Sequence, residues 1–391
     1  MTLLELITKA SVSAQPPTTP PDYPVVLDPD SIFPNLNLKD NELSASNLAV
    51  PITGWKISQL DSEVIDLCKQ FFTKLQGKLK NRTTFAKEQF LEILNSFLEN
   101  FKEKLGLSIR VASSNSGYTK VLVEKVGFYM GTDVAALVLE ACIVFETWEL
   151  VETLISNGLV VNSCYPNLVP KLVASERSDL LCHCIKQASD LGSSELLTIL
   201  KYFLSSSKQA ATGTILNVRN EWEKQALFAI EKATDKTLSV ANSILAKEAA
   251  VLLMVAYDGF SSPELCLHYL LASVNVDEVI LSSAFSKLNG KEMLTLIRYL
   301  GKWLKKYERF PQAVPCPKAS TLLGLKACDW VPKLDDVVRC VGLVLDGNFS
   351  ALVLIPEFHE ELRSIESVVA SLALESRLCC SVANVIENFE K

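Results

Sequence analysis

The pattern of apolar and polar residues is helical over most of the chain, from about residue 134 to residue 389. Apolar side chains recur every three or four positions, and turn residues such as Asn157 and Gly158 separate the segments. This spacing is typical of amphipathic α-helices. The predicted helices cover residues 134–145, 147–157, 167–174, 176–189, 194–205, 216–233, 238–257, 263–272, 276–286, 290–308, 333–345 and 357–388, the last of them interrupted.

Short turns between these segments indicate antiparallel neighbours, so we expect an all-α fold, either an irregular α-solenoid or a helical-bundle array. The segments show no strict repeat period, which argues against a tetratricopeptide or ankyrin array. Two helix starts carry the spacing of a capping box, Ser261 with Glu264 and Asn289 with Glu292. In such a box each of the two residues satisfies a backbone N–H at the start of the helix.

Two further apolar runs precede this array, one from Val64 to Leu79 and one from Phe90 to Phe101. They predict a helical hairpin, with Thr84 as the N-cap of its second helix. Residues 106–130 are ambiguous, because Val121 to Val126 fits a strand as well as a helix.

The first part of the chain lacks any sustained period. Eight of the sixteen prolines fall between Pro16 and Pro51. This composition predicts a mostly disordered segment over residues 1–57, which is either a plain flexible leader or a tail that docks in extended form. We therefore expect three parts: this Pro-rich leader, a helical hairpin with a connector over residues 58–130, and a helical-repeat-like scaffold domain over residues 131–391.

Composition narrows the classes of function. The net charge is −7, so the chain as a whole does not attract nucleic acid, and any such contact needs a local basic patch. Eleven cysteines are scattered among apolar neighbours, and no secretory signal precedes them, which indicates reduced thiols in the cytosol or nucleus. The most apolar stretch, Val337 to Ile355, contains Arg339 and Asp346, so we reject it as a membrane span.

The residues that usually carry catalysis or bind metals are sparse. The chain has three histidines and no Gly-rich phosphate loop. Cys182 and Cys184 lie two positions apart, so on a helix their thiols point about 200° apart and do not converge on one ion. His359 and His268 are interpreted as a surface residue and a partly buried residue. We expect no catalytic residue, no metal, no cofactor and no small-molecule substrate, and therefore no enzyme.

One helix has a distinctive surface. A basic face is predicted on the helix 290–308, and its members are Lys291, Arg298, Lys302, Lys305 and Arg309. Their spacing places them within a stripe of roughly 60° that has no acidic residue at its centre. A charged helix face is most often simply solvated. The alternative is contact with RNA phosphates or with an acidic partner, and this face is the site that we consider for it.

Several segments of the second half resemble a known family. Cys328-Asp329-Trp330 is followed by the segments 343–349 (LVLDGNF) and 352–357 (LVLIPE). This order resembles the C-terminal end of the nucleolar protein 11 family. The segment 200–204 (LKYFL) and the stretch from Tyr299 to Tyr307 are similar to two further pieces of that family, in the same order. The resemblance covers roughly residues 130–372.

The resemblance implies a non-catalytic scaffold in the nucleolus of the nucleus. It implies membership of the small-subunit processome, a role in ribosome biogenesis through pre-18S rRNA processing, and a link to ribosomal DNA transcription. Partners would be other processome proteins and pre-ribosomal RNA, bound directly or through those proteins, and no membrane. Longer family members carry a β-propeller, whereas residues 1–130 show no propeller period, so we expect a short form. The alternative is a generic helical protein–protein adaptor outside the nucleolus, such as in membrane traffic.

Overall fold

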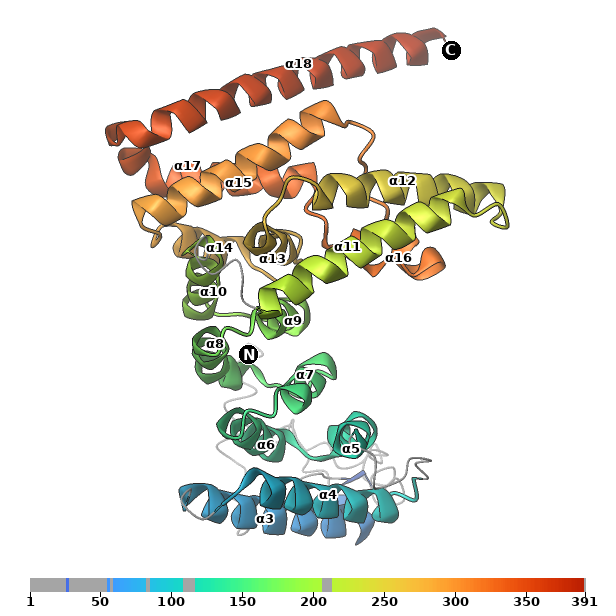
Figure 1. The fold of residues 1–391 in the computed structure, drawn as a ribbon, viewed down its shortest axis with the longest axis vertical. Coiled ribbons are helices and arrows are strands. Elements are labelled where there is room, and N and C mark those ends of the chain that lie inside the picture. Colours follow the sequence, from blue (N-terminus) through green and yellow to red (C-terminus); the bar gives the residue numbers. More distant parts are fainter. Residues whose placement is uncertain are drawn as a thin grey trace, which may run out of the picture. The chain divides into compact units, whose positions relative to one another are not determined.

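The computed structural model describes residues 26–27, 55–56, 59–81, 85–107, 117–205 and 213–389. Helices make up most of these ranges (Figure 1). Two short strands, β1 (Val26–Leu27) and β2 (Trp55–Lys56), pair antiparallel. The predicted all-α class is therefore confirmed. The rest of the Pro-rich leader predicted over residues 1–57 lies outside the described residues. The chain divides into two compact units, Met1–Leu150 and Val151–Lys391. The three parts predicted from the sequence stay a prediction.

The first unit contains the predicted helical hairpin, formed by α3 (Gln59–Lys80) and α4 (Lys87–Lys104). Phe71 of α3 stacks on Phe97 of α4 with ring centroids 3.9 Å apart. The prediction of Thr84 as N-cap is wrong, because α4 begins at Lys87 and its N-cap is Ala86. The cap at Ala86 makes no side-chain hydrogen bond, so the apolar contact between the two helices carries this hairpin.

The ambiguous connector is helical as well. It forms α5 (Tyr118–Val126) and the short η2 (Gly127–Tyr129), followed by α6 (Thr132–Val144), and α7 (Trp148–Ser156) lies at the boundary of the two units. Leu122, Val123 and Val126 are buried, because α5 packs on α4. Gly131 joins η2 to α6 with a φ of 72°, a conformation that favours glycine over residues with a side chain.

The second unit continues the series of helices. Its elements are η3 (Asn162–Cys164), α8 (Tyr165–Ala174), α9 (Ser178–Gln187), α10 (Ser193–Ser205), α11 (Gly213–Thr234), α12 (Val240–Tyr257), α13 (Ser262–Leu271), α14 (Glu278–Phe285), α15 (Gly290–Arg309), α16 (Pro317–Leu323), η5 (Lys326–Trp330), α17 (Leu334–Leu354), η6 (Pro356–Phe358) and α18 (His359–Phe389). Neighbours along the chain pack on each other, α8 on α9 and α11 on α12, and α10 also packs on α8 and α14. The predicted helices of the array are present with ends shifted by a few residues, except at the C-terminal end.

Three differences occur there. The last helix, α18, runs without the predicted interruption, because no Gly or Pro follows Pro356. The irregularity lies instead in α17, where Asn348 has a φ of −130° and its side-chain Nδ2 donates to the carbonyl of Val344. The short elements α16 and η5 were not predicted, because neither is long enough to show a helical period.

A buried aromatic cluster forms the core of the second unit around α13 and α15. The Trp303 indole N–H donates to the Tyr299 hydroxyl over 3.1 Å, and that hydroxyl donates to Nδ1 of His268 over 2.8 Å. Nε2 of His268 donates to the Ala256 carbonyl over 2.9 Å. Burial lowers the pKa of His268 to about 3, so the imidazole is neutral in the folded chain. Phe260 packs edge-on against this ring.

Both predicted capping boxes are confirmed. At the start of α15 the Asn289 side chain accepts from the Glu292 N–H over 3.0 Å, and the Glu292 carboxylate accepts from the Asn289 N–H over 2.9 Å. At the start of α13 the Glu264 carboxylate accepts from the backbone N–H and from the hydroxyl of Ser261. These boxes define where α13 and α15 begin, and the two helices position the basic face described next.

Candidate functional site

The basic face lies on α15, a strongly amphipathic helix. Its opposite side is buried against α17 and other helices of the second unit, and Met293, Leu296, Leu300 and Leu304 are among the buried residues. Trp303 is also buried, so it is a core residue and does not offer a surface for stacking a nucleic-acid base. The exposed side of α15 therefore has charged side chains and no exposed aromatic ring among its described residues.

The centre of the basic face is paired with acids from other helices. Nε of Arg298 donates to Oε1 of Glu361 on α18 over 2.7 Å. The Lys302 ammonium donates to both carboxylate oxygens of Glu264 on α13, over 2.8 and 2.9 Å. The sequence of α15 has no acid at the centre of its face, yet the tertiary structure brings two there. Arg298 and Lys302 are thus neutralised within the chain.

The two ends of the face differ from its centre. Lys291, Lys305 and Arg309 are exposed, and none of them forms an ion pair with another described residue. The Arg309 guanidinium lies 5.3 Å from the ring centroid of Phe310, which directly follows α15. Since α15 rises about 1.5 Å per residue, roughly 27 Å separates Lys291 from Arg309. The structure therefore divides the predicted face into one basic residue at the start and a basic pair at the end.

Lys306 belongs to the same end, although the sequence did not single it out. Its ammonium lies 3.9 Å from Oδ2 of Asp258 and 5.1 Å from the ring centroid of Phe260. Burial lowers the pKa of Lys306, and the nearby carboxylate of Asp258 opposes this effect. Its position four residues after Lys302 was the signal in the sequence, because such residues are neighbours on a helix.

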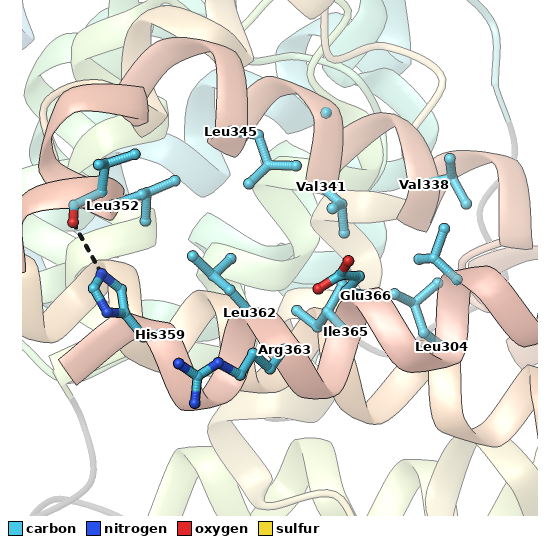
Figure 2. Close-up of a pocket in the computed structure, with 13 residues that line it drawn as sticks. Leu304, Val338, Val341, Leu345, Leu352, His359, Leu362, Arg363, Ile365 and Glu366 are labelled. Carbon is cyan, nitrogen blue, oxygen red and sulfur yellow. Dashed lines mark hydrogen bonds between the residues drawn. The ribbon is translucent and has the colours of Figure 1, made fainter. Parts of the chain in front are cut away.

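A second surface feature is an apolar groove of about 730 Å³ between α17 and α18 (Figure 2). Val338, Val341 and Leu345 of α17 face Leu362 and Ile365 of α18, as Figure 2 shows. The sequence prediction missed this groove. Its signal was a second apolar stripe on α17, which only the packing of α18 turns into one wall of a groove.

The polar groups of the groove lie at its edge. Nε2 of His359 donates to the Val353 carbonyl over 2.9 Å, so this histidine holds the end of α17 against the start of α18. Arg363 and Glu366 are the charged residues of the lining. The groups at this groove do not form a nucleophile with a base, and its chemistry suits apolar packing.

The other candidate residues are placed as follows. Cys182 and Cys184 are buried on α9, and burial raises the pKa of the Cys184 thiol above its usual range. Between them His183 lies on the outer side of α9, with Nε2 3.8 Å from Oε1 of Glu152. Over the described ranges, no three or more His, Cys, Asp and Glu side chains gather in a way that could hold a metal ion.

Two stretches, Val240–Tyr257 and Lys326–Leu354, are long and apolar enough to cross a membrane by length and composition, with mean hydropathies of 1.5 and 1.7. Core helices of soluble proteins meet the same criteria, so length and composition do not distinguish a membrane span from a core helix. Within the second unit α12 packs on α11 and α16, and α17 packs on α14 and α15. Both stretches thus serve as packing helices in this structure.

Comparison with protein-family models gives no match for this sequence. A search of curated proteins gives no match either.

Proposed function

We propose that this protein is a non-catalytic helical scaffold of nucleolar ribosome assembly. It would act within the small-subunit processome, support pre-18S rRNA processing and connect that process to ribosomal DNA transcription. Its partners would be other processome proteins, with pre-ribosomal RNA bound directly or through them. The proposal joins an architecture of stacked helices to the resemblance of several ordered segments to the nucleolar protein 11 family.

The observation that carries the proposal is how these segments pack. They lie in α10 (residues 200–204), α15 (299–307), η5 (328–330) and the stretch from α17 to η6 (343–357). α10 packs on α15, α15 packs on α17, and α17 contacts η6. The segments in α10, α15 and α17 to η6 therefore pack on one another, whereas η5 packs on α11, α12 and α16 of the same unit, and this supports a shared folded domain.

The burial of these segments supports the resemblance to the family. Tyr299, Trp303 and Cys328 are buried, and Phe203 is buried in α10. Such residues serve packing, so the resemblance concerns the scaffold itself. Binding would then use the surface, where a basic end of α15 and an apolar groove are both available to partners.

The proposal is tested by purifying the tagged full chain from nuclear extract. Mass spectrometry identifies the proteins that co-purify, and reverse transcription detects the 5′ external spacer of pre-ribosomal RNA. We expect small-subunit processome proteins together with spacer RNA. A parallel purification with the tag alone measures the background, and a ribonuclease-treated sample shows whether the proteins associate without RNA.

Recovery of cytoplasmic or coat proteins without pre-ribosomal RNA would overturn this proposal and favour a helical adaptor outside the nucleolus. Imaging the tagged chain in cells gives a second readout. The proposed function requires accumulation in the nucleolus, whereas a cytoplasmic or vesicular pattern contradicts it.

A further inference from the structure

A small hollow lies beside the end of α15, on the surface of the second unit. It has a volume of about 420 Å³ and lies between α12 and the segment that follows α15. Its apolar lining comes from Val251, Met254 and Val255 of α12 and from Phe310. Met254 is 41% exposed, and a flexible methionine at the mouth of a hollow adapts to side chains of different shapes.

The hollow continues into an apolar strip along α12. Val240 is 79% exposed and Ile244 is 53% exposed. With Lys247, Val251 and Met254 they follow the spacing i, i+4, i+7, i+11 and i+14, so they lie on one face of the helix, within roughly 80°. The strip is apolar apart from the exposed Lys247, and it leads into the hollow. Such a surface fits a short peptide helix, which would place one or two large apolar side chains on it.

The charged residues of the lining are Asp258 and Lys306, and further basic side chains lie on the last turns of α15. Arg309 lies against Phe310, and Lys306 is part of the lining. Lys305 lies one turn before Arg309 and forms no ion pair with a described residue. The acidic residue of the lining is Asp258, and the Lys306 ammonium lies 3.9 Å from its carboxylate. An incoming carboxylate would therefore find basic side chains available at the edge of an apolar surface.

We propose that the hollow between α12 and the end of α15 binds an acidic peptide segment of a partner protein that carries large apolar side chains. Its carboxylates pair with Lys305 and Arg309, and its apolar side chains pack on Met254 and Val251. The proposal deepens the scaffold function and rests on it, since it names the kind of partner that uses the end of the basic face.

The same observations favour a peptide over RNA. Single-stranded RNA is bound by a continuous basic groove with exposed aromatic rings on which bases stack. On α15 the centre of the basic face is already paired with Glu264 and Glu361, and Trp303 and Tyr307 are buried. Lys247 is the one charged residue of the strip on α12, and its other members, Val240, Ile244, Val251 and Met254, suit the apolar side of a peptide helix.

The test measures binding of a labelled peptide to the purified full chain by fluorescence anisotropy. The probe is a helical peptide of glutamates and leucines with one phenylalanine, about four turns long. Matched probes replace either its glutamates with lysines or its leucines with alanines, and a labelled uridine oligonucleotide of similar length tests RNA. We expect the acidic apolar peptide to bind most tightly of the four probes.

Variants assign the binding to the hollow. Lys305→Glu with Arg309→Glu is expected to weaken binding about tenfold or more, because attraction becomes repulsion. Met254→Asp is expected to weaken it without a change in the charge of α15. Lys171→Glu reverses the charge of an exposed lysine on α8, so it is the control for a charge reversal outside the hollow and is expected to bind as the unchanged chain does. Thermal unfolding confirms that each variant is folded.

The proposal is overturned if the acidic apolar peptide does not bind, if the uridine oligonucleotide binds more tightly, or if the variants at the hollow bind as well as the control. This assay needs no nuclear extract. If the peptide does not bind while the tagged chain still recovers processome proteins, the proposed peptide site is wrong and the scaffold function stands. If the peptide binds while no processome protein is recovered, only the scaffold function fails.

Discussion

Arg298 on α15 and Glu361 on α18 form an ion pair, with 2.7 Å between Nε and Oε1. The two residues are far apart in the sequence, and their contact connects α18 to the centre of the basic face on α15. In the same region Ile365 of α18 packs on Gly301 of α15. An ion pair and apolar packing therefore hold α18 on α15. Figure 1 shows the two helices next to each other.

We expect Arg298→Glu to lower the free energy of unfolding by only about 1 kcal/mol, because the Arg298 side chain is 56% exposed and water screens the pair. Urea denaturation measures this change. The double variant Arg298→Glu with Glu361→Arg restores the pair with its charges exchanged, so it is expected to recover most of the loss. A double variant that is no more stable than Arg298→Glu would show that the pair contributes nothing.

Gly301 provides the close approach of α18 to α15. A Cβ at this position would lie 3.4 Å from Cγ1 of Ile365, so Gly301→Ala is expected to change stability little. Alanine favours a helix over glycine by about 1 kcal/mol, and the tight contact offsets part of this gain. Gly301→Leu is expected to cost about 1–3 kcal/mol by pushing α18 away. Hydrogen exchange checks the cause, since faster exchange should be confined to α18 and its contacts.

Lys302 and Lys305 are neighbours on the basic face, yet they should respond differently to charge reversal. The Lys302 ammonium pairs with Glu264, whose side chain is only 12% exposed and which also caps α13. Lys302→Glu is therefore expected to cost about 1–3 kcal/mol. Lys305→Glu should stay within about 0.5 kcal/mol, because Lys305 is exposed and forms no ion pair with a described residue. Thermal unfolding of both variants checks this difference, and equal losses would contradict the assigned pairing.

The Tyr299 hydroxyl links a buried donor to a buried acceptor. It accepts from the Trp303 indole N–H and donates to Nδ1 of His268. Tyr299→Phe leaves both partners without this bond, so we expect a loss of about 2–4 kcal/mol in the free energy of unfolding. Tyr129→Phe removes a hydroxyl from a residue that is 51% exposed and serves as the control. Urea denaturation measures the free energy of unfolding of both variants. If Tyr299→Phe is as stable as the unchanged chain, the hydroxyl does not stabilise the core.

His268 should make the chain sensitive to acid. Its pKa is lowered from 6.5 to about 3 in the folded state, first by burial and then by the Lys306 charge. Between these pH values the unfolded state binds more protons than the folded state, so stability falls as the pH falls below 6.5. At pH 5 the expected loss is about 2 kcal/mol relative to neutral pH. Denaturation in urea at both pH values measures it.

The matched variant for this prediction is His268→Gln. A glutamine can donate to the Ala256 carbonyl and accept from the Tyr299 hydroxyl without binding a proton. The pKa of His183 is also lowered by burial, and carboxylates titrate as well, so the difference between the two chains isolates the contribution of His268. If His268→Gln loses as much stability between pH 7 and pH 5 as the unchanged chain, the prediction fails.

Local features of the sequence were sufficient for most of the helices. The apolar spacing predicted the series from α6 to α15, and the capping boxes at Ser261 and Asn289 were predicted from spacing alone. Where local signals were weak the prediction failed, at the Thr84 cap, at the short helix α16 and in the expected interruption of α18. These elements depend on contacts with other helices, which a pattern of a few residues does not contain.

The sequence by itself determined which residues of α15 form a basic face and which form a buried one, because a helix repeats every 3.6 residues through bonds to near neighbours. Only the tertiary structure decided what each charge does. It paired Arg298 with Glu361 and Lys302 with Glu264, and it left the end of α15 beside an apolar hollow. The physical reason is that ion pairs and hollows arise between helices, so they follow from which helices pack together and not from the period of any one of them.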